Sequence, residues 1–365
     1  MSGVEGGTLP RVRYATGRAR RKPRSSGPAL VREAPHNAEI APDALGAFIT
    51  PAAARFVRAN FAVPRIDPRR HRLEIGGAVE RRISLGLADL RAWPQRTLVV
   101  TTECAGNQRT SLSPLPPGEP WLGGAVSTGT FTGVPLAEVL ERAGLRSDAV
   151  EVLAEGADAG KTPSGETHFA RALPVGKALD PDTLLALEMN GKPLKPAHGA
   201  PLRLIVPGWY GMASVKWVSR IEALTAPFAG YFQSERYIFL ESGRTAEPVR
   251  EMRVKASFSS PAPGESVELG PVLIGGMAWS GSAPIAKVEV AFAGGSDWLE
   301  ARLTGPAERH AWRRWELTWV PPWRGRHVLR CRATDASGNV QPDVPRWNAL
   351  GYGANAVQSL VVLVR

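Results

Sequence analysis

The chain has 365 residues, of which 43% are hydrophobic and 22% charged, and it carries a formal net charge of +11. This length exceeds what one hydrophobic core usually serves, so we expect two domains, and the composition excludes a mostly disordered or fibrous chain. No stretch approaches the roughly 18 consecutive apolar residues of a membrane span, and no apolar run follows the N-terminal arginines as in a signal peptide. Two cysteines are too few for a disulfide scaffold. We therefore predict a soluble, cytoplasmic protein with no membrane partner.

The positive charge is concentrated in the first 34 residues, where eight arginines and lysines face two glutamates. This segment is rich in Gly, Ser, Pro and Arg and nearly free of large apolar residues, so it cannot repay its ordering entropy by burial. We predict that residues 1–34 form a disordered basic tail. Such a tail can bind polyanions weakly, but a solvated arm explains it more simply, and a nucleic-acid partner is not expected.

The globular part begins at residue 35 with mixed elements. Residues 73–75, followed by two glycines, predict a short strand, and residues 96–102 predict a β-rich strand that leads to the first cysteine. Apolar residues at helical spacing predict an amphipathic helix over residues 136–143, and Gly144 then ends it. This half of the chain is therefore predicted to be α+β.

After residue 250 the hydrophobic pattern changes to period two. Apolar residues alternate with polar ones over residues 288–290 and 315–319, as expected for half-buried strands. Turn signals recur between these runs, at residues 293–297 and 335–339. The pattern predicts an antiparallel β-sandwich over residues 251–365.

Several familiar chemistries are not supported by the sequence. Residues 156–162 read Gly-Ala-Asp-Ala-Gly-Lys-Thr, with three residues between the glycines where a phosphate loop needs four, so a surface turn is expected there. None of the six histidines lies at zinc-ligand spacing from another histidine or a cysteine. The Gly-x-Ser-x-Gly and Gly-x-Gly-x-x-Gly motifs are absent, which disfavours hydrolases and dinucleotide enzymes.

Cys104 is the most informative single residue. It ends a predicted strand and is followed by Ala-Gly and then Asn-Gln-Arg. Small residues let the backbone approach a bulky group, and the nearby Arg109 favours a thiolate, which is a good ligand for a high-valent metal. Burial as a structural cysteine explains Cys104 equally well when this motif is considered alone.

A second cluster of polar residues favours Cys104 as a metal ligand over a structural cysteine. Residues 198–217 place four polar side chains among glycines, and such donors suit an anionic, heteroatom-rich cofactor with a phosphate. These donors are His198, Arg203, Ser214 and Lys216. With this cluster and the Cys104 motif together, the chain resembles the sulfite oxidase family of molybdenum enzymes, from about Asn37 to the end of the sandwich.

The resemblance implies a sulfite oxidase-like molybdopterin-binding domain over residues 35–250, which holds molybdenum through a single pterin dithiolene. It also implies that residues 251–365 form an all-β immunoglobulin-like domain that makes a homodimer. Cys104 matches the metal ligand, while Arg109 and Tyr237 match a catalytic arginine and tyrosine beside the metal's oxo group. Seven residues match positions that hold the cofactor: Asn60, Asp158, His198, Arg203, Ser214, Val215 and Lys216.

The chain departs from the family in the substrate pocket. The family segment ends in Arg-Asn-His, whereas this chain reads Arg-Ala-Asn-Phe over residues 58–61. In the register that keeps the asparagine, Ala59 replaces a substrate arginine, Phe61 replaces a histidine, and Arg58 points elsewhere. Leu350 replaces a second substrate arginine. Because hydrogen bonds to charged groups contribute roughly 1.5–3 kcal/mol each, we expect weakened sulfite binding.

The predicted function is therefore a molybdenum-dependent oxidoreductase that transfers an oxygen atom at a Mo-oxo centre, with sulfite or a related sulfur compound as substrate. A reductase of an S-oxide, an N-oxide or nitrate is the first alternative, and a non-catalytic binding protein of the same fold is the second. The sequence has no Cys-x-x-Cys-His haem motif and too few cysteines for an iron–sulfur cluster. We therefore expect a separate electron-transfer protein as partner.

Overall fold

Strands dominate the computed structural model, which describes residues 28–41, 45–292 and 297–365. The helices are short: α1 (Leu87–Ala92), α2 (Leu136–Ala143) and α3 (Val175–Ala178). The predicted α+β class is therefore too helical, because the fold is mostly β with few helices. Among the described residues, none of the helices has the length and apolarity needed to cross a bilayer.

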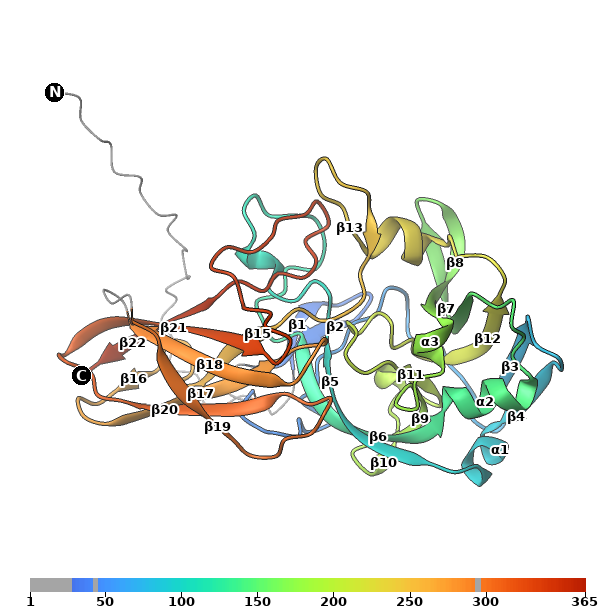
Figure 1. Ribbon diagram of the computed structural model, residues 1–365, viewed down its shortest axis with the longest axis horizontal. Helices are drawn as coiled ribbons and strands as arrows, with labels where there is room; N and C mark the ends of the chain where they lie inside the picture. Colours follow the sequence, from blue (N-terminus) through green and yellow to red (C-terminus); the bar gives the residue numbers. More distant parts are fainter. Residues whose placement is uncertain (1–27, 42–44, 293–296) are drawn as a thin grey trace.

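Two five-stranded sheets form the first half of the molecule (Figure 1). One has the order β10-β9-β6-β5, with β11 also paired to β9. Its strands are β5 (Arg96–Glu103), β6 (Val126–Pro135), β9 (Leu184–Met189), β10 (Lys192–Pro193) and β11 (Arg203–Ile205). The other has the order β4-β3-β12-β7-β8, and only its β3–β12 pair is parallel. Its strands are β3 (Arg72–Gly77), β4 (Ile83–Gly86), β7 (Glu151–Thr162), β8 (Gly165–Pro174) and β12 (Val218–Leu224).

Most of the predicted elements of this half are confirmed. Strands β3 and β5 cover the two predicted strands, and α2 ends as predicted at Gly144, whose φ of 72° suits a residue without a side chain. The predicted surface turn over residues 156–162 is wrong, because these residues continue β7. The pairing of β7 with β8 shifts register between Glu155 and Ala159. Such irregularities re-aim side chains beside functional sites, and this one contains Asp158.

The N-terminal strands correct the predicted tail. Strand β1 (Ala29–Arg32) pairs with β2 (Asn37–Glu39), so the last residues of the predicted tail form a strand. The side chain of Val31 packs against the buried cluster that contains Cys104 and Trp121, and this apolar contact stabilises the strand. Residues 1–27 of the predicted tail lie outside the described residues.

The second half follows a short ribbon of β13 (Ile238–Phe239) and β14 (Glu247–Pro248). Eight strands then pair in the order β15-β17-β20-β19-β18-β21-β22-β16 and surround a core of their own. They are β15 (Lys255–Ser260), β16 (Ser266–Val267), β17 (Val272–Trp279), β18 (Ile285–Phe292), β19 (Leu299–Thr304), β20 (Arg313–Trp319), β21 (Gly325–Asp335) and β22 (Gln358–Val364). The predicted alternation in β18 and β20 is confirmed, and so is the turn after β21, where Asp335 accepts backbone N–H groups. The immunoglobulin-like assignment stays a prediction.

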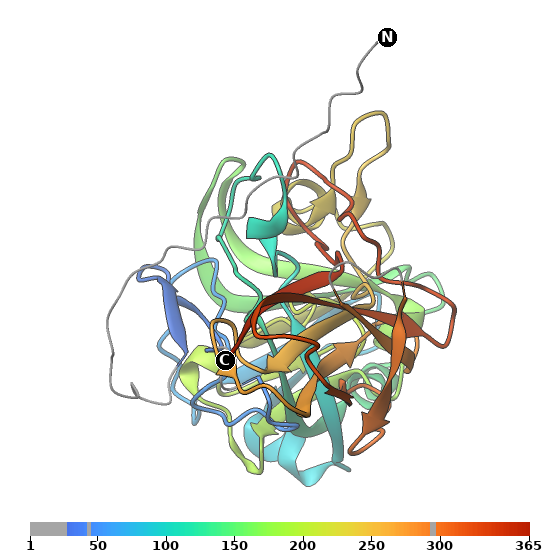
Figure 2. The same cartoon turned by 90° about the vertical axis from the view of Figure 1, so that its left-hand side faces the viewer.

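The two halves share one continuous core. Trp279, Trp312 and Tyr352 of the second half belong to the same buried cluster as Trp209 and Tyr210 of the first. Figure 1 shows the second half beside the end of the β5–β6 pair, and in Figure 2 the second half lies in front of the first. Strand β5, which leads to Cys104, is therefore supported from both halves of the molecule.

Candidate active site

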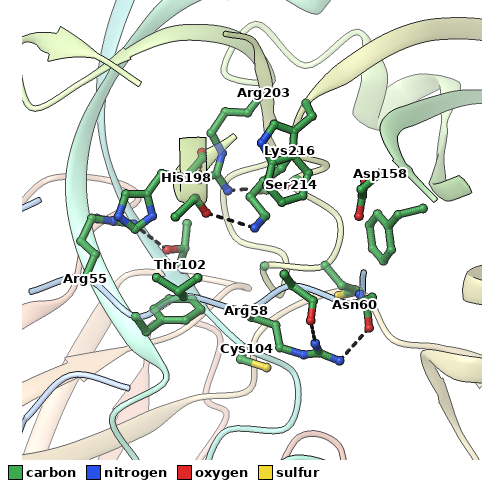
Figure 3. Close-up of a pocket in the computed structure, with 18 of the residues that line it drawn as sticks. Arg55, Arg58, Asn60, Thr102, Cys104, Asp158, His198, Arg203, Ser214 and Lys216 are labelled. Atoms are coloured by element: carbon green, nitrogen blue, oxygen red, sulfur yellow. Dashed lines mark hydrogen bonds between the residues drawn. The ribbon is translucent and has the colours of Figure 1, made fainter. Parts of the chain in front are cut away.

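One pocket collects most of the predicted site residues (Figure 3). It contains about 750 Å³ of empty space, including its open mouth, which lies within the range of roughly 300–1,000 Å³ that is usual for ligand and cofactor sites. Eight of the predicted residues line it: Asn60, Cys104, Asp158, His198, Arg203, Ser214, Lys216 and Tyr237. The first sheet, the second sheet and the loops between them all contribute to its wall.

Cys104 lies in the pocket wall directly after β5. Its backbone N–H donates to Ala125 over 2.8 Å, and its carbonyl accepts from Asn107 over 2.9 Å, so the turn is fixed on both sides. Burial raises the pKa of the Cys104 thiol, although Arg58 and Arg109 both act to lower it. The protein alone therefore does not make Cys104 an acidic thiol, whereas coordination to a metal deprotonates a thiol outright.

Positive groups gather at the buried end of the pocket. Arg203 donates to the carbonyl of His198 over 3.0 Å, and Lys216 donates to that of Ala197 over 3.2 Å. These neutral acceptors do not compensate the charge of Arg203, whereas Asp158 partly compensates the charge of Lys216. Burial, reinforced by the neighbouring arginines, lowers the pKa of His198 to about 3, so its imidazole is neutral. Burial likewise lowers the pKa of Arg203 to about 10. An anion bound at this end would relieve all of these costs.

Acceptor groups line another part of the pocket. Burial raises the pKa of Asp158 to about 6, although Lys216 acts to lower it. The Oδ1 atom of Asp158 has no hydrogen-bond partner within the part of the chain that the structure describes. Asn60 is 3.3 Å from the Tyr237 hydroxyl and accepts a 2.6 Å hydrogen bond from Arg58. Figure 3 shows Asp158 and Asn60 on the same side of the pocket, away from His198.

The position of Arg58 differs from the one expected from the alignment of residues 58–61 with the family segment. Its guanidinium lies in the pocket, and the ionised forms of Tyr237 and Cys104 raise its pKa in spite of burial, which lowers it. The prediction that Arg58 points elsewhere is wrong. Ala59 is 2% exposed, and its backbone N–H donates to Asn37 over 2.7 Å, which fixes the turn that directs Arg58 inward. The pocket therefore keeps a guanidinium beside the cysteine.

Two predicted site residues do not line the pocket. Arg109 lies behind its wall, where it donates to the carbonyls of Glu119 over 2.7 Å and Leu350 over 3.2 Å. A Cβ at Gly106 would lie 2.5 Å from Arg109, so this glycine makes room for the arginine and not for a cofactor. Val215 packs in the main core and is 1% exposed. The side chain of Leu350 packs against that core, so this residue supplies no cation where the resemblance places a second substrate arginine.

The sequence analysis missed other lining residues, among them Arg55, Thr102, Phe169 and Trp217. Thr102 was detectable, because in a strand residues two apart share a face and Cys104 follows it by two. Arg55 is 3% exposed and lies three residues before Arg58, with no motif around it. Its burial depends on contacts that are distant in the sequence.

The pKa of Lys216 leads to a prediction for protein prepared without a cofactor. Burial and Arg203 lower this pKa from 10.5 to about 7, so above pH 7 the folded state releases a proton that the unfolded chain keeps. The buried ammonium of Lys216, which destabilises the folded state, is fully charged below that pH and loses its charge as the pH rises. Between about pH 7 and 9, the unfolding free energy should therefore rise relative to that of Lys216→Met, by at most about 1.4 kcal/mol per pH unit. Urea unfolding measures this difference, and parallel pH profiles of the two proteins would contradict it.

Comparisons with known proteins agree with this geometry. Residues 60–232 match the family described as the oxidoreductase molybdopterin binding domain, and residues 246–364 match the Mo-co oxidoreductase dimerisation domain. Sulfite oxidase of Gallus gallus is 37% identical over 92% of this chain and 77% of its own length. Mitochondrial sulfite oxidase of Rattus norvegicus is 36% identical over 88% of this chain, which spans only 63% of that relative's length. The crystal structure of the sulfane dehydrogenase SoxCD from Paracoccus pantotrophus aligns with a TM-score of 0.79 at 31% identity, covering 88% of this chain and 82% of that one. The chain belongs to the sulfite oxidase family of molybdopterin oxidoreductases.

The residues of the pocket fit the cofactor of this family. Arg55, Asp158 and Arg203 each have a buried polar atom without a hydrogen-bond partner in the described part of the chain. Donors at one end suit a phosphate, and acceptors elsewhere suit the N–H groups of a pterin. The described residues include no cluster of three His, Cys, Asp or Glu side chains that could hold a metal. A metal at Cys104 therefore needs ligands from outside the protein, which a dithiolene supplies.

Proposed function

We propose that this protein is a molybdenum oxidoreductase that oxidises sulfite or a related anionic sulfur compound by oxygen-atom transfer. The observation that carries the proposal is the Arg58 guanidinium in the same pocket as the Cys104 thiol. Sulfite oxidases at 36–37% identity and a sulfane dehydrogenase at 31% support sulfur as the reacting element.

The residues of the chain have separate tasks in this proposal. When bound, the pterin-held molybdenum supplies an oxo group and accepts two electrons. Cys104 ligates the metal. Arg58 attracts and orients the anion by charge-assisted hydrogen bonds. The Tyr237 hydroxyl accepts a hydrogen bond from Nδ2 of Asn60, which leaves its own hydrogen free to donate to an oxygen on which charge develops. Arg109 acts from behind the wall as a positioning residue and as a source of positive potential at Cys104.

Two alternatives have different support. A reductase of nitrate or of an S- or N-oxide is the first, because the NADH nitrate reductase of Ulva prolifera is 31% identical over 85% of this chain. A non-catalytic binding protein is disfavoured, since it has no use for buried donors without partners around a cysteine. Rates with sulfite plus an artificial acceptor, and with oxides plus an artificial donor, distinguish oxidase from reductase.

Metal and cofactor analysis tests the proposal directly. Protein from a host that makes molybdopterin should contain about one molybdenum and one pterin per chain, because the pocket contains one cysteine. Inductively coupled plasma analysis and fluorescence of the oxidised pterin measure the two components. Protein that contains neither would refute the proposed function.

Arg58 should determine the affinity for the anionic substrate. For Arg58→Met we expect KM to rise by about 10–100-fold, because one hydrogen bond to a charged group contributes roughly 1.5–3 kcal/mol. Arg58→Lys should recover part of this loss, and Arg69→Met is a control at an exposed arginine. If Arg58→Met keeps the parent KM, then Arg58 does not bind the substrate.

The assembly is proposed from the family. We infer a homodimer formed through residues 251–365, because residues 246–364 match a dimerisation domain. Electrons then pass to a separate electron-transfer protein, and the cytoplasmic location stays a prediction. A monomer in light scattering at micromolar concentration would contradict the dimer.

A further inference from the structure

Arg55 lies at the buried end of the pocket, where the protein satisfies its guanidinium only in part. Its side chain lines the pocket, and one nitrogen, Nη2, donates to Thr102 over 2.9 Å (Figure 3). The other terminal nitrogen, Nη1, is buried and has no hydrogen-bond partner among the described residues. A buried guanidinium N–H without an acceptor is costly.

Arg55 shares its surroundings with a second buried arginine, Arg203. The Phe131 ring offers each guanidinium a favourable cation–π contact, but the two positive charges repel each other. The guanidinium carbon of Arg55 is 5.3 Å from the centre of the Phe131 ring, and that of Arg203 is 5.5 Å from the same centre. Burial and the repulsion from Arg203 lower the pKa of Arg55 to about 9. In the described part of the chain, no carboxylate forms an ion pair with either arginine. Two like charges are therefore held together without a counterion.

Strand positions connect Arg55 to the metal-binding end of the pocket. Thr102 and Cys104 lie two residues apart at the end of β5, so they face the same side. Gly129 on the neighbouring β6 leaves room for the guanidinium, because a Cβ there would lie 2.6 Å from Nη1 of Arg55. The protein thus gives up side-chain volume to accommodate this charge.

We propose that the Arg55 guanidinium, which lines the pocket, binds the terminal phosphate of the pterin cofactor jointly with Arg203. Thr102 accepts a hydrogen bond from Arg55 and so orients it. The end of β5 therefore positions both Cys104, which ligates the metal, and Arg55, which binds the phosphate. A phosphate monoester dianion supplies the two negative charges that this pair of arginines lacks. This inference rests on the proposed function, and it adds a cofactor-binding residue that the motifs do not contain.

The test compares Arg55→Met, Arg55→Lys and Thr102→Val with the parent protein, with Arg72→Met as an exposed control. Cofactor-free proteins are melted with and without inorganic phosphate. Arg55→Met should melt at the parent temperature or above it, because it removes a buried charge. The phosphate concentration that gives half of the stabilisation should rise about 10-fold or more, as expected for one charge-assisted hydrogen bond. Arg55→Lys should lie between the two, and Arg72→Met should match the parent.

Cofactor content provides a second readout. From a host that makes molybdopterin, Arg55→Met should be purified with less pterin per chain than the parent. If Arg55→Met keeps both the pterin content and the phosphate response of the parent, the inference is overturned. If it then differs from the parent only in a lower melting temperature, Arg55 has a structural role and does not bind the cofactor. If Arg55→Met does not fold, Thr102→Val must show the weakened phosphate response, or the inference is again overturned. A parent protein without molybdenum and pterin refutes the proposed function itself.

Discussion

Replacing Cys104 with alanine should abolish oxygen transfer and leave the fold intact. Among the residues that line the pocket, Cys104 offers the one thiol, and no cluster of metal-binding side chains in the described residues can substitute for it. Loss of an outer-shell partner of a metal ligand costs about 10–100-fold in affinity or activity, so loss of the ligand should exceed about 100-fold. Turnover of sulfite with an artificial acceptor, and the electron paramagnetic resonance signal of Mo(V), measure the effect.

Cys331→Ala is the matched control, because Cys331 is also buried but lies in the core of the second half. It should lose little activity and keep the Mo(V) signal. The cofactor-free form of Cys104→Ala should unfold at nearly the same urea concentration as the parent, since Cys104 belongs only to a small cluster with Trp121 and Ala125. A Cys104→Ala protein with molybdenum bound and turnover within about threefold of the parent would exclude Cys104 as the ligand.

Local hydrophobic patterns predicted several helices and strands correctly, but they did not predict that strands greatly outnumber helices. Strands with clear alternation, such as β18 and β20, and the helix that ends at Gly144 were predicted because the periodicity and the stop signal agree. Residues 156–162 were misassigned because their small and polar side chains resemble a turn. Here they are tolerated in a strand, since Asp158 lines the pocket and residues 159–162 are exposed or only partly buried, so this end of β7 need not pack in a core. The pocket that explains this composition forms only in the folded chain.

The error at Arg58 has a different origin. The segment around it is irregular, so no period assigns its side chains to one face or the other, and two alignments that differ by one residue are equally consistent with the motif. The structure selects between them through Asn37, which binds the backbone N–H of Ala59 from a distance of 22 residues in the sequence. Arg55 was missed for a related reason. Arginine is mostly exposed, and only Thr102, Gly129 and Phe131 together show why it is buried here.

Lys255→Met should cause the largest loss of stability among these variants. Lys255 and Glu103 are both 0% exposed, and their charged groups are 2.6 Å apart across the boundary between the two halves. Glu103 also accepts from Trp279 over 2.9 Å and from Asn107 over 3.0 Å. Removal of one partner leaves a buried charge without compensation, which costs about 3–5 kcal/mol. Urea unfolding of the cofactor-free protein measures this loss.

The double variant Glu103→Gln with Lys255→Gln distinguishes the effect of the buried charges from the effect of side-chain packing, because it removes both charges and keeps side chains of similar size. Two amides can keep a hydrogen bond without a buried charge, so the double variant should be more stable than either single one, and the double-mutant cycle should show strong coupling. Arg302→Met breaks an exposed ion pair with Glu316 and should cost less than about 1 kcal/mol. If Lys255→Met costs no more than this control, the buried pair does not join the two halves. If it costs the expected amount, the second half also holds the end of β5 in place, where Glu103 directly precedes Cys104, the proposed metal ligand.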